Sequence, residues 1–501
     1  MINFGTIKDA TSTEAVTRFV EEHVLPGTDW ILVKVKRKSI RLEPPYAYWT
    51  TFRVIVGRGE PLTQESPEVP TEETPAEAAA ASMPAEPSER DAAEAASGAE
   101  AEPEPGEPIQ PPAARYGEER ELRLVARGVF DSAQWATYRE RILRMYGTRP
   151  CRPLEGLGYP QLFEDTQHVV WFYPIDPNLR GLDAISDPEL MGSYFRKNSE
   201  HVLGRPGNIT GVKIELARYL PEIAAITRYD LEAIPPSASK TVFGKSQNGD
   251  RGAESDRVGH EMWRLAERSE GRLRVPRPLG YEHAEGIYFQ DSVPGTALGT
   301  DRTAPEFMPG VLHAAEALAT IHDSGIDTRK SFGLDGEIGR LDRVLDQFAI
   351  VHPRGYFLLR ELLAHIRSKL RGVKEEEIVP THGDYKYDQL LHHEGTYSLI
   401  DFDYFAATET SFDLGKFCGH LMPSMPKDWQ QAYAADQART AFLHRYRELR
   451  PNATLQRFQI YEATNLAGRA MTLMWGQGRG WKESAETMLV LAMERLRSRL
   501  P

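Results

Sequence analysis

Cysteine is almost absent from this sequence, since only Cys151 and Cys418 occur among 501 residues. Two cysteines are too few for a disulfide scaffold or a cysteine-rich zinc site, and a reducing cytoplasm is the simple expectation. The sequence also lacks any run of about twenty apolar residues, so no membrane-spanning helix is expected. Residues 1–10 show neither the basic region nor the apolar core of a secretory signal.

A basic face of the kind that binds nucleic acid is missing as well, and the formal net charge is −13. Residues 60–107 contain fourteen Asp or Glu and one basic residue, Arg90, so the rest of the chain sums to zero. Because this segment is rich in Pro and Ala and has little to bury, we predict a disordered, solvated loop at about 60–115. An acidic docking tail is the alternative interpretation.

Hydrophobic patterns divide the chain into three expected parts. Residues 1–205 read as a small α+β module that includes the acidic loop, and residues 206–292 as three strands, a helix and further strands. Residues 293–501 are mostly helical, interrupted by two short strands near 378–406. No internal repeat is visible. The first module is expected to contain helices at 13–24 and 132–145 and strands at 30–36, 48–56 and 122–130.

The strongest chemical signal is the segment 381–391, THGDYKYDQLL, followed by YSLIDFDY at 397–404. Phosphoryl transfer needs a carboxylate that takes the proton of the acceptor hydroxyl, and oxygen ligands that hold Mg²⁺ against the phosphates. Asp384 is the candidate for the first role. Gln389, five residues later, and Asp401, after an apolar strand, are candidates for the second, with Asp403 as an additional metal ligand.

These motifs resemble those of the aminoglycoside phosphotransferase, choline kinase and maltokinase group of small-molecule kinases, from about Gly211 to the C-terminus. The resemblance implies a protein-kinase-like bilobal α+β fold, with a small antiparallel-sheet N-lobe (206–292) and a helical C-lobe (293–501), preceded by the N-terminal module. It also implies ATP, or another nucleoside triphosphate, and Mg²⁺ as cofactors. The implied reaction moves the γ-phosphoryl group to a hydroxyl of a small molecule.

The resemblance also suggests which residues surround the nucleotide. Lys245 is expected to contact the α- and β-phosphates, and a glutamate of the next helix is expected to hold it in place. Glu261 is the favoured partner. Gln290 and Val293 lie where the hinge between the lobes reads the adenine, although Val293 also fits a simple turn. The other glutamates considered as partners of the lysine are Glu254 and Glu267.

Three residues around the catalytic loop have further interpretations. His382 is expected to be a structural hydrogen-bonding residue. Asp413 either hydrogen-bonds back to the loop or caps a helix. Lys386 stands where many relatives have His, and it either contacts the γ-phosphate or competes for Asp384 and lowers its pKa. The turn at 220–222 has no glycine-rich cradle, so the strand lysine and the metal would hold the phosphates.

The acceptor is predicted only by charge. Residues 414–500 contain thirteen Lys or Arg and seven Asp or Glu, a balance of +6. Because polycationic aminoglycosides are normally held by carboxylates, a sugar, a polyol or an anionic acceptor fits better. Arg469 and Trp475 either line that site or belong to the surface and the core.

Two further questions stay open at the level of the sequence. The N-terminal module loosely resembles the cap of maltokinases in layout, but it equally fits a partner-binding or oligomerisation unit. A pseudokinase that acts as a nucleotide-binding regulatory scaffold is the alternative function. The presence of Lys245, Asp384 and Asp401 together weighs against it.

Overall fold

The computed structural model of the chain describes residues 12–43, 47–62, 115–249, 251–423 and 429–498. Most of the acidic segment, for which a disordered loop was predicted, lies outside these residues. The strands on either side of it, β2 (Ala47–Leu62) and β3 (Arg115–Val129), pair in antiparallel register along their length. One sheet therefore contains both flanks of the segment.

The N-terminal unit is a five-stranded antiparallel sheet, in the order β1-β2-β3-β5-β4, between two helices. Side chains of a strand alternate between its two faces. In β3, Leu124 faces α2 and Val125 faces α5, and each face has its own apolar core. The remaining elements of this unit are α2 (Thr13–His23), β1 (Ile31–Glu43), α5 (Ser132–Tyr146), β4 (Gln161–Phe163) and β5 (His168–Phe172).

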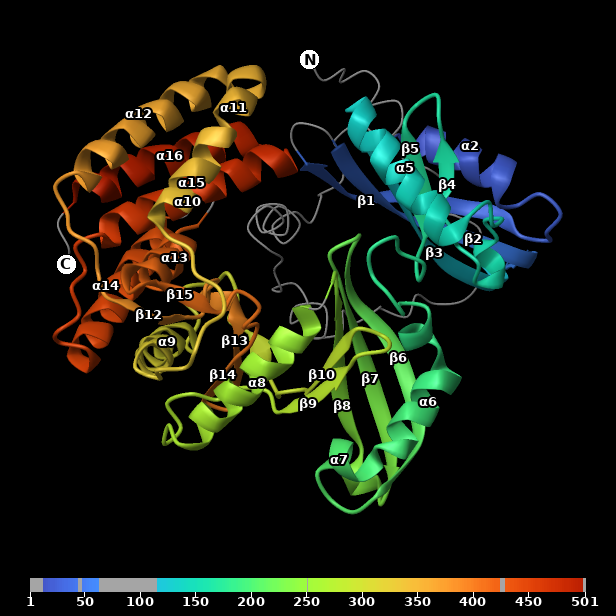
Figure 1. The fold of residues 1–501 in the computed structure, drawn as a ribbon, viewed down its shortest axis with the longest axis horizontal. Helices are drawn as coiled ribbons and strands as arrows, with labels where there is room; N and C mark the ends of the chain where they lie inside the picture. The colour runs from blue at the N-terminus through green and yellow to red at the C-terminus, as the bar shows by residue number, and fades with distance from the viewer. Residues whose placement is uncertain (1–11, 44–46, 63–114, 250, 424–428, 499–501) are drawn as a thin grey trace.

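A second five-stranded antiparallel sheet follows, in the order β6-β7-β8-β10-β9. Helices α6 and α7 cover one face, where Phe195 packs against Tyr229 and Phe289. Helix α8 lies against β8, β9 and β10 and joins this sheet to the helical lobe (Figure 1). The elements are α6 (Pro188–Lys197), α7 (Ser199–Leu203), β6 (Asn208–Leu220), β7 (Ala224–Ile234), β8 (Lys240–Gln247), α8 (Arg251–Glu267), β9 (Pro278–Glu282) and β10 (Ile287–Asp291).

The position of α6 and α7 changes one predicted boundary. The sequence assigned residues up to 205 to the N-terminal module, whereas both helices pack on the second sheet. Their apolar side chains Met191, Phe195 and Val202 belong to the apolar core on that sheet. The second unit therefore begins with these helices, upstream of the predicted limit.

The rest of the described chain is a helical lobe with two small sheets, β11-β13-β14 and β12-β15. Its core centres on α9, α13 and α15, whose inward faces are fully buried. The elements are β11 (Thr296–Ala297), α9 (Phe307–His322), α10 (Leu334–Arg343), α11 (Leu345–Val351), α12 (Pro353–Leu370), β12 (Ile378–Thr381), β13 (Leu390–His393), β14 (Thr396–Leu399), β15 (Ala406–Glu409), α13 (Ser411–Leu421), α14 (Trp429–Leu449), α15 (Phe458–Gly476) and α16 (Trp481–Arg497).

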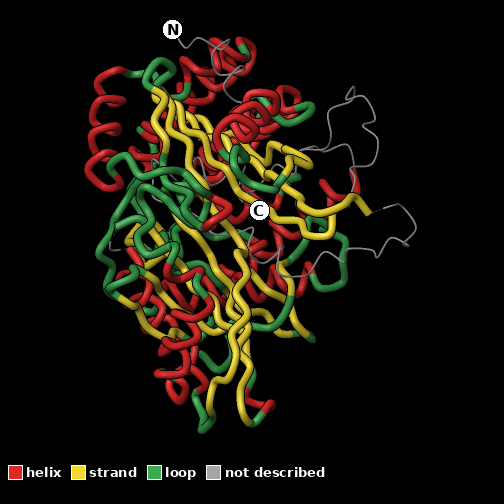
Figure 2. Tube along the Cα trace, turned by 90° about the vertical axis from the view of Figure 1, so that its right-hand side faces the viewer, coloured by secondary structure: helices red, strands yellow, loops and turns green. Residues whose placement is uncertain are grey.

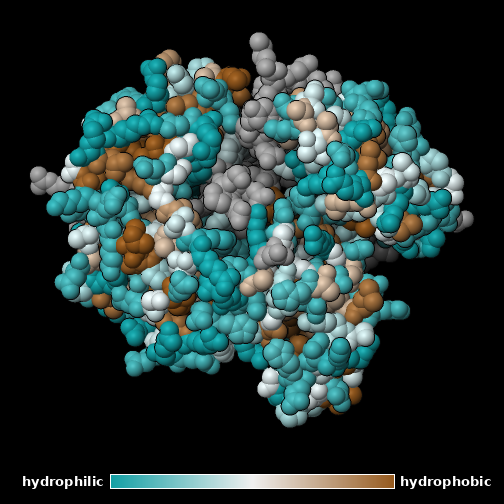
Figure 3. Space-filling view, in the orientation of Figure 1, coloured by the Kyte–Doolittle hydropathy of each residue, from teal (hydrophilic) through white to brown (hydrophobic). Residues whose placement is uncertain are grey.

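The predicted bilobal α+β architecture is confirmed: an antiparallel sheet with one helix on its inner side adjoins a helical lobe, and an α+β unit precedes both. Figure 2 shows the strands of the first sheet above those of the second. The visible surface is mainly hydrophilic, with apolar side chains gathered between α12 and α16 (Figure 3). Within the described residues, no helix combines the length and apolarity that crossing a bilayer requires.

Candidate active site

The segment that carries the strongest motif follows β12, and a buried carboxylate braces its backbone. Asp413, in the first turn of α13, accepts hydrogen bonds from the backbone N–H of His382 (2.7 Å) and of Gly383 (3.0 Å). Of the two interpretations offered for Asp413, the structure shows the bond back to the loop. The helix N-cap is Thr410, so Asp413 does not cap it.

His382 and Gly383 are fixed by packing and backbone geometry. His382 is fully buried, its Nε2 donates to the carbonyl of Ile400 (3.1 Å), and burial lowers its pKa. Gly383 has φ of 84°, and a Cβ at this position would overlap the carbonyl oxygen of Tyr404. Both residues therefore support the loop, and both ring nitrogens of His382 are hydrogen-bonded to backbone groups.

Asp384 lies at the centre of the site and is fully buried. Its Oδ2 accepts a hydrogen bond from Nε2 of Gln389 (3.0 Å) and pairs with Nζ of Lys386 (3.0 Å). Its Oδ1 pairs with Nζ of Lys416. Lys386 thus contacts Asp384, the candidate base, directly. The interpretation in which Lys386 competes for Asp384 requires this contact.

Lys416 is a site residue that the sequence interpretation missed. It lies on α13 three residues after Asp413, and residues three apart share one face of a helix. Its side chain is 5% exposed, so the ammonium group is enclosed beside Asp384. The spacing Asp413-x-x-Lys416 was the signal available in the sequence.

Asp401 follows β14 and faces the same space. It has φ of 71°, in the left-handed region that Asp tolerates better than most residues. Nε2 of Gln389 is 3.5 Å from Oδ2 of Asp401, and Nζ of Lys245 is 3.4 Å from Oδ1. Burial raises the pKa of Asp401 well above its usual range, while the charge of Lys245 acts in the opposite direction. A cation bound here would favour the ionised carboxylate.

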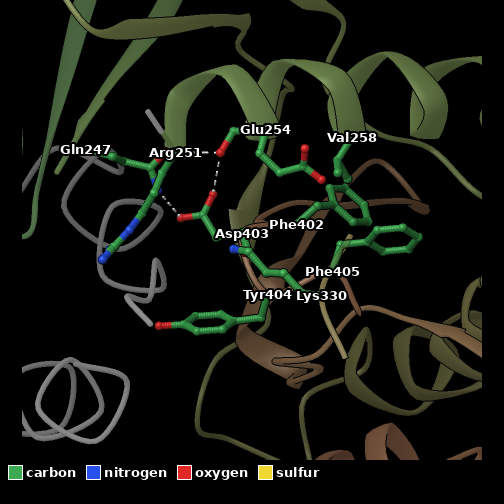
Figure 4. Close-up of a pocket in the computed structure, with 10 residues that line it drawn as sticks. Gln247, Arg251, Glu254, Val258, Lys330, Phe402, Asp403, Tyr404 and Phe405 are labelled. Atoms are coloured by element: carbon green, nitrogen blue, oxygen red, sulfur yellow. Dashed lines mark hydrogen bonds between the residues drawn. The ribbon is translucent and has the colours of Figure 1, made fainter. Parts of the chain in front are cut away.

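Lys245 has a different partner from the one predicted. Its Nζ pairs with Asp403, which also accepts from Nε2 of Gln247 (2.8 Å) and from the hydroxyl of Ser255 (3.1 Å). Figure 4 shows Asp403 facing Gln247 under α8. Glu261 instead pairs with Arg264 (2.8 Å).

The helix rotation explains why Glu261 does not meet Lys245. Val258, Met262 and Leu265 turn toward the core, so Glu261 lies beside that buried face, with its side chain 34% exposed. The other two glutamates considered have partners elsewhere: Glu254 pairs with Arg257 (2.6 Å) and Arg329 (3.2 Å), and Glu267 accepts from Trp263 (3.1 Å). Ser255, a residue that the sequence did not single out, is the α8 side chain that donates to Asp403.

The donor set of the site fits Mg²⁺. The described residues contain no group of three or more His, Cys, Asp or Glu that could hold a metal ion by themselves. Mg²⁺ in phosphate-transfer sites is typically held by one or two carboxylates together with phosphate oxygens. Asp401 and Asp403 each offer such a carboxylate. Gln389 offers an amide oxygen once its side-chain amide group is flipped.

The predicted hinge residues lie at the junction of the lobes. Gln290, in β10, pairs with Phe243 of β8. Val293 lies in the link between β10 and β11. The two residues considered for the acceptor site have scaffold contacts instead. Arg469 donates to the carbonyls of Gly419 and Met422 (both 2.6 Å), and the indole of Trp475 donates to Gln347 (2.8 Å).

Arg218 is the second site residue that the sequence interpretation missed. It lies near the end of β6, half-buried, and interacts electrostatically with Asp401, Asp388 and Asp384. The hairpin that contains it was recognised in the sequence, but the alternation of β6 alone does not show which lobe its side chains face. Four aspartates and four basic side chains thus meet here: Asp384, Asp388, Asp401, Asp403, Lys245, Lys386, Lys416 and Arg218.

Comparison with known proteins identifies the class to which this arrangement belongs. Residues 249–452 match the model of the phosphotransferase enzyme family. The match agrees with the family that the motifs suggested and supports a kinase-type phosphotransferase.

Similar solved structures have low sequence identity to this chain. A putative aminoglycoside phosphotransferase from Ralstonia eutropha is 16% identical, covers 61% of this chain and 98% of its own, and has a TM-score of 0.44. Choline kinase from Cryptosporidium parvum is 12% identical, with 61% and 94% covered and a TM-score of 0.43. Choline kinase from Streptococcus pneumoniae is 14% identical, with 62% and 99% covered and a TM-score of 0.41. No curated protein matches the chain.

Proposed function

We propose that this protein transfers the γ-phosphoryl group of ATP, or of another nucleoside triphosphate, to a hydroxyl of a small non-cationic molecule, a sugar or polyol rather than an aminoglycoside. The observation that carries the proposal is the placement of Asp384. It lies on a loop braced by Asp413, within hydrogen-bonding distance of Gln389, and Gln389 also reaches Asp401. Residues 206–292, together with α6 and α7 before them, and residues 293–501 would serve as the two lobes, with the rest of the N-terminal module as a cap.

The roles of the chain's own residues follow from their positions. Asp384 accepts the proton of the acceptor hydroxyl as its oxygen attacks the γ-phosphorus, and the bond from that phosphorus to the bridging oxygen breaks. Lys386 is adjacent to Asp384 and suited to contact the γ-phosphate, and Lys245 to contact the α- and β-phosphates. Gln389, Asp401 and Asp403 would hold Mg²⁺, which supplies positive charge to the phosphate oxygens when bound.

The preference against aminoglycosides rests on the charge around the base. Two ammonium groups, those of Lys386 and Lys416, already pair with the two oxygens of Asp384. A polycationic acceptor entering here would bring further positive charge next to them, and like charges in a buried site repel strongly. A neutral or anionic acceptor avoids this cost.

A screen of acceptors tests the proposed function. Sugars, polyols, sugar acids, amino alcohols and aminoglycosides are each incubated with Mg-ATP, and acceptor-dependent ADP release is measured. We expect release with at least one neutral or anionic acceptor, and a loss of about 1,000-fold in kcat for Asp384→Asn. A protein that binds Mg-ATP but phosphorylates none of these acceptors would instead favour the regulatory scaffold.

A further inference from the structure

The hairpin between β6 and β7 brings a charged side chain to the face of the sheet that carries Lys245. Arg218 pairs with Ile226 of β7, and Ile226 pairs with Lys245 of β8. Residues paired across neighbouring strands point to the same face of a sheet. Arg218 and Lys245 therefore belong to one row, two strands and about 10 Å apart.

The neighbouring residue confirms the direction of the arginine. Tyr219 points to the opposite side, where its hydroxyl donates to Asp176 (2.7 Å) and accepts from the indole of Trp171 (3.0 Å). The pairing of β6 with β7 has a register irregularity between Leu216 and Arg218, at the point where Arg218 and Tyr219 take opposite faces. The guanidinium of Arg218 is thereby directed toward Asp384, Asp388 and Asp401, where the phosphates of a nucleotide would lie.

The tip of the same hairpin is anchored in the N-terminal unit. Glu222, 2% exposed, accepts from the indole of Trp49 (2.8 Å) and the hydroxyl of Tyr138 (2.9 Å). It also pairs with Arg127 and with Arg141 (3.1 Å). Such a buried, multiply bonded carboxylate fixes the hairpin firmly, because removing it would leave several buried donors without an acceptor.

We propose that Arg218 is a further phosphate-binding residue of the transfer reaction, and that Glu222 is a positioning residue that holds its hairpin in place. Arg218 supplies, as a single charged side chain, the contact that backbone amides of a glycine-rich loop supply in other kinases. The proposal rests on the nucleotide-dependent function proposed above. It assigns the N-terminal unit a part in catalysis, through four side chains that bind Glu222.

The test compares ligands that differ only in their phosphates. Binding of Mg-ATP and of adenosine is measured by calorimetry for the wild-type chain and for Arg218→Ala, Arg218→Lys and Glu222→Gln. Arg218→Ala is expected to raise the Kd of Mg-ATP at least tenfold, roughly the contribution of one charge-assisted hydrogen bond, and to leave that of adenosine unchanged. Arg218→Lys should recover part of the loss, and Glu222→Gln should show a smaller loss in the same direction.

The matched control is Lys213→Ala, which removes a positive charge from an exposed position of the same strand and should leave both affinities unchanged. If Arg218→Ala is unstable, Arg218→Lys decides the question, because a structural arginine would affect adenosine and Mg-ATP equally. Unchanged Mg-ATP binding in a folded Arg218 variant overturns the inference while leaving the proposed function intact. A wild-type chain that binds adenosine and Mg-ATP equally well, or not at all, overturns both.

Discussion

The two five-stranded sheets have the same strand order and different chemistry. Each consists of three antiparallel strands, a helix and a hairpin whose second strand pairs with the third: β1-β2-β3-β5-β4 and β6-β7-β8-β10-β9. Arg127 pairs with the second residue of β5, and Lys245 with the second residue of β10. The same position of the same topology therefore carries a cation in both sheets.

What differs is the group that each cation meets. Lys245 faces Asp401 and Asp403 across the junction of the lobes, an acidic site that would contain metal and phosphates in a working enzyme. Arg127 faces Glu222, a carboxylate in the β6–β7 turn of the second sheet. The position in a sheet determines where a charge lies, whereas the elements opposite determine whether that charge faces a candidate nucleotide site or a structural partner.

The largest expected effect comes from the cation of the second sheet. Lys245→Met is expected to lower kcat about 1,000-fold with little change in the melting temperature, because the lysine would act on the phosphates and its loss leaves Asp403 with two other donors. Steady-state kinetics and thermal melting measure the two quantities. A melting temperature that falls as far as the activity would give Lys245 a structural role.

The matched substitution in the first sheet should show the reverse pattern. Arg127→Met is expected to lower the free energy of unfolding by about 3 kcal/mol, because it removes one partner of the buried Glu222. The value lies at the low end for buried pairs, since Trp49, Tyr138 and Arg141 remain. Denaturant unfolding measures it. A loss of kcat at full stability as large as that of Lys245→Met would contradict the distinction between the two sheets.

Asp176, which accepts hydrogen bonds from Tyr219 and from the backbone of Glu222, should make the free energy of unfolding depend on pH. Burial, with the nearby charge of Glu222, raises the pKa of Asp176 to about 6 from an ordinary value of 3.8. The folded state then holds a proton that the unfolded state has lost, so the free energy of unfolding should fall as pH rises from about 4 to 6. The decrease amounts to at most about 3 kcal/mol.

Denaturant titrations at several pH values test this dependence. Asp176→Asn should remove the decrease over this range while other carboxylates still contribute at lower pH. The variant should also be less stable than the wild type at every pH. The asparagine amide has one acceptor oxygen in place of two, whereas Tyr219 and the backbone of Glu222 are among the donors that Asp176 accepts from. An unchanged slope in the variant would assign the pH dependence to other groups.

The sequence predicted the geometry of the segment around Asp384 better than that of its surroundings, for a physical reason. Gly383, Asp384 and Gln389 lie within one short loop, where spacing along the chain sets spacing in space. Asp401 follows the adjacent strand, which pairs with the strand after the loop. Such local geometry is readable from sequence.

Contacts between distant segments were not readable. Lys416 contacts Asp384 from α13, and Arg218 of β6 lies within electrostatic range of it; only tertiary packing brings these elements together. The wrong partner for Lys245 has the same origin: the rotation of α8 depends on which apolar residues enter the core, and Glu261 lies just outside that face. The two sheets share a strand order, but the sequence contains no visible internal repeat from which this could be predicted.

The pairing of β2 with β3 has a consequence for how this protein can change over evolutionary time. The covalent connection between these strands is residues 63–114, whereas ladder hydrogen bonds and two apolar cores hold the strands together. Each doubling of a connection's length costs only about 0.6 kcal/mol in closure entropy. Insertions and deletions there are therefore nearly neutral, and homologues should differ far more in this connection than in the hairpin tip at Glu222.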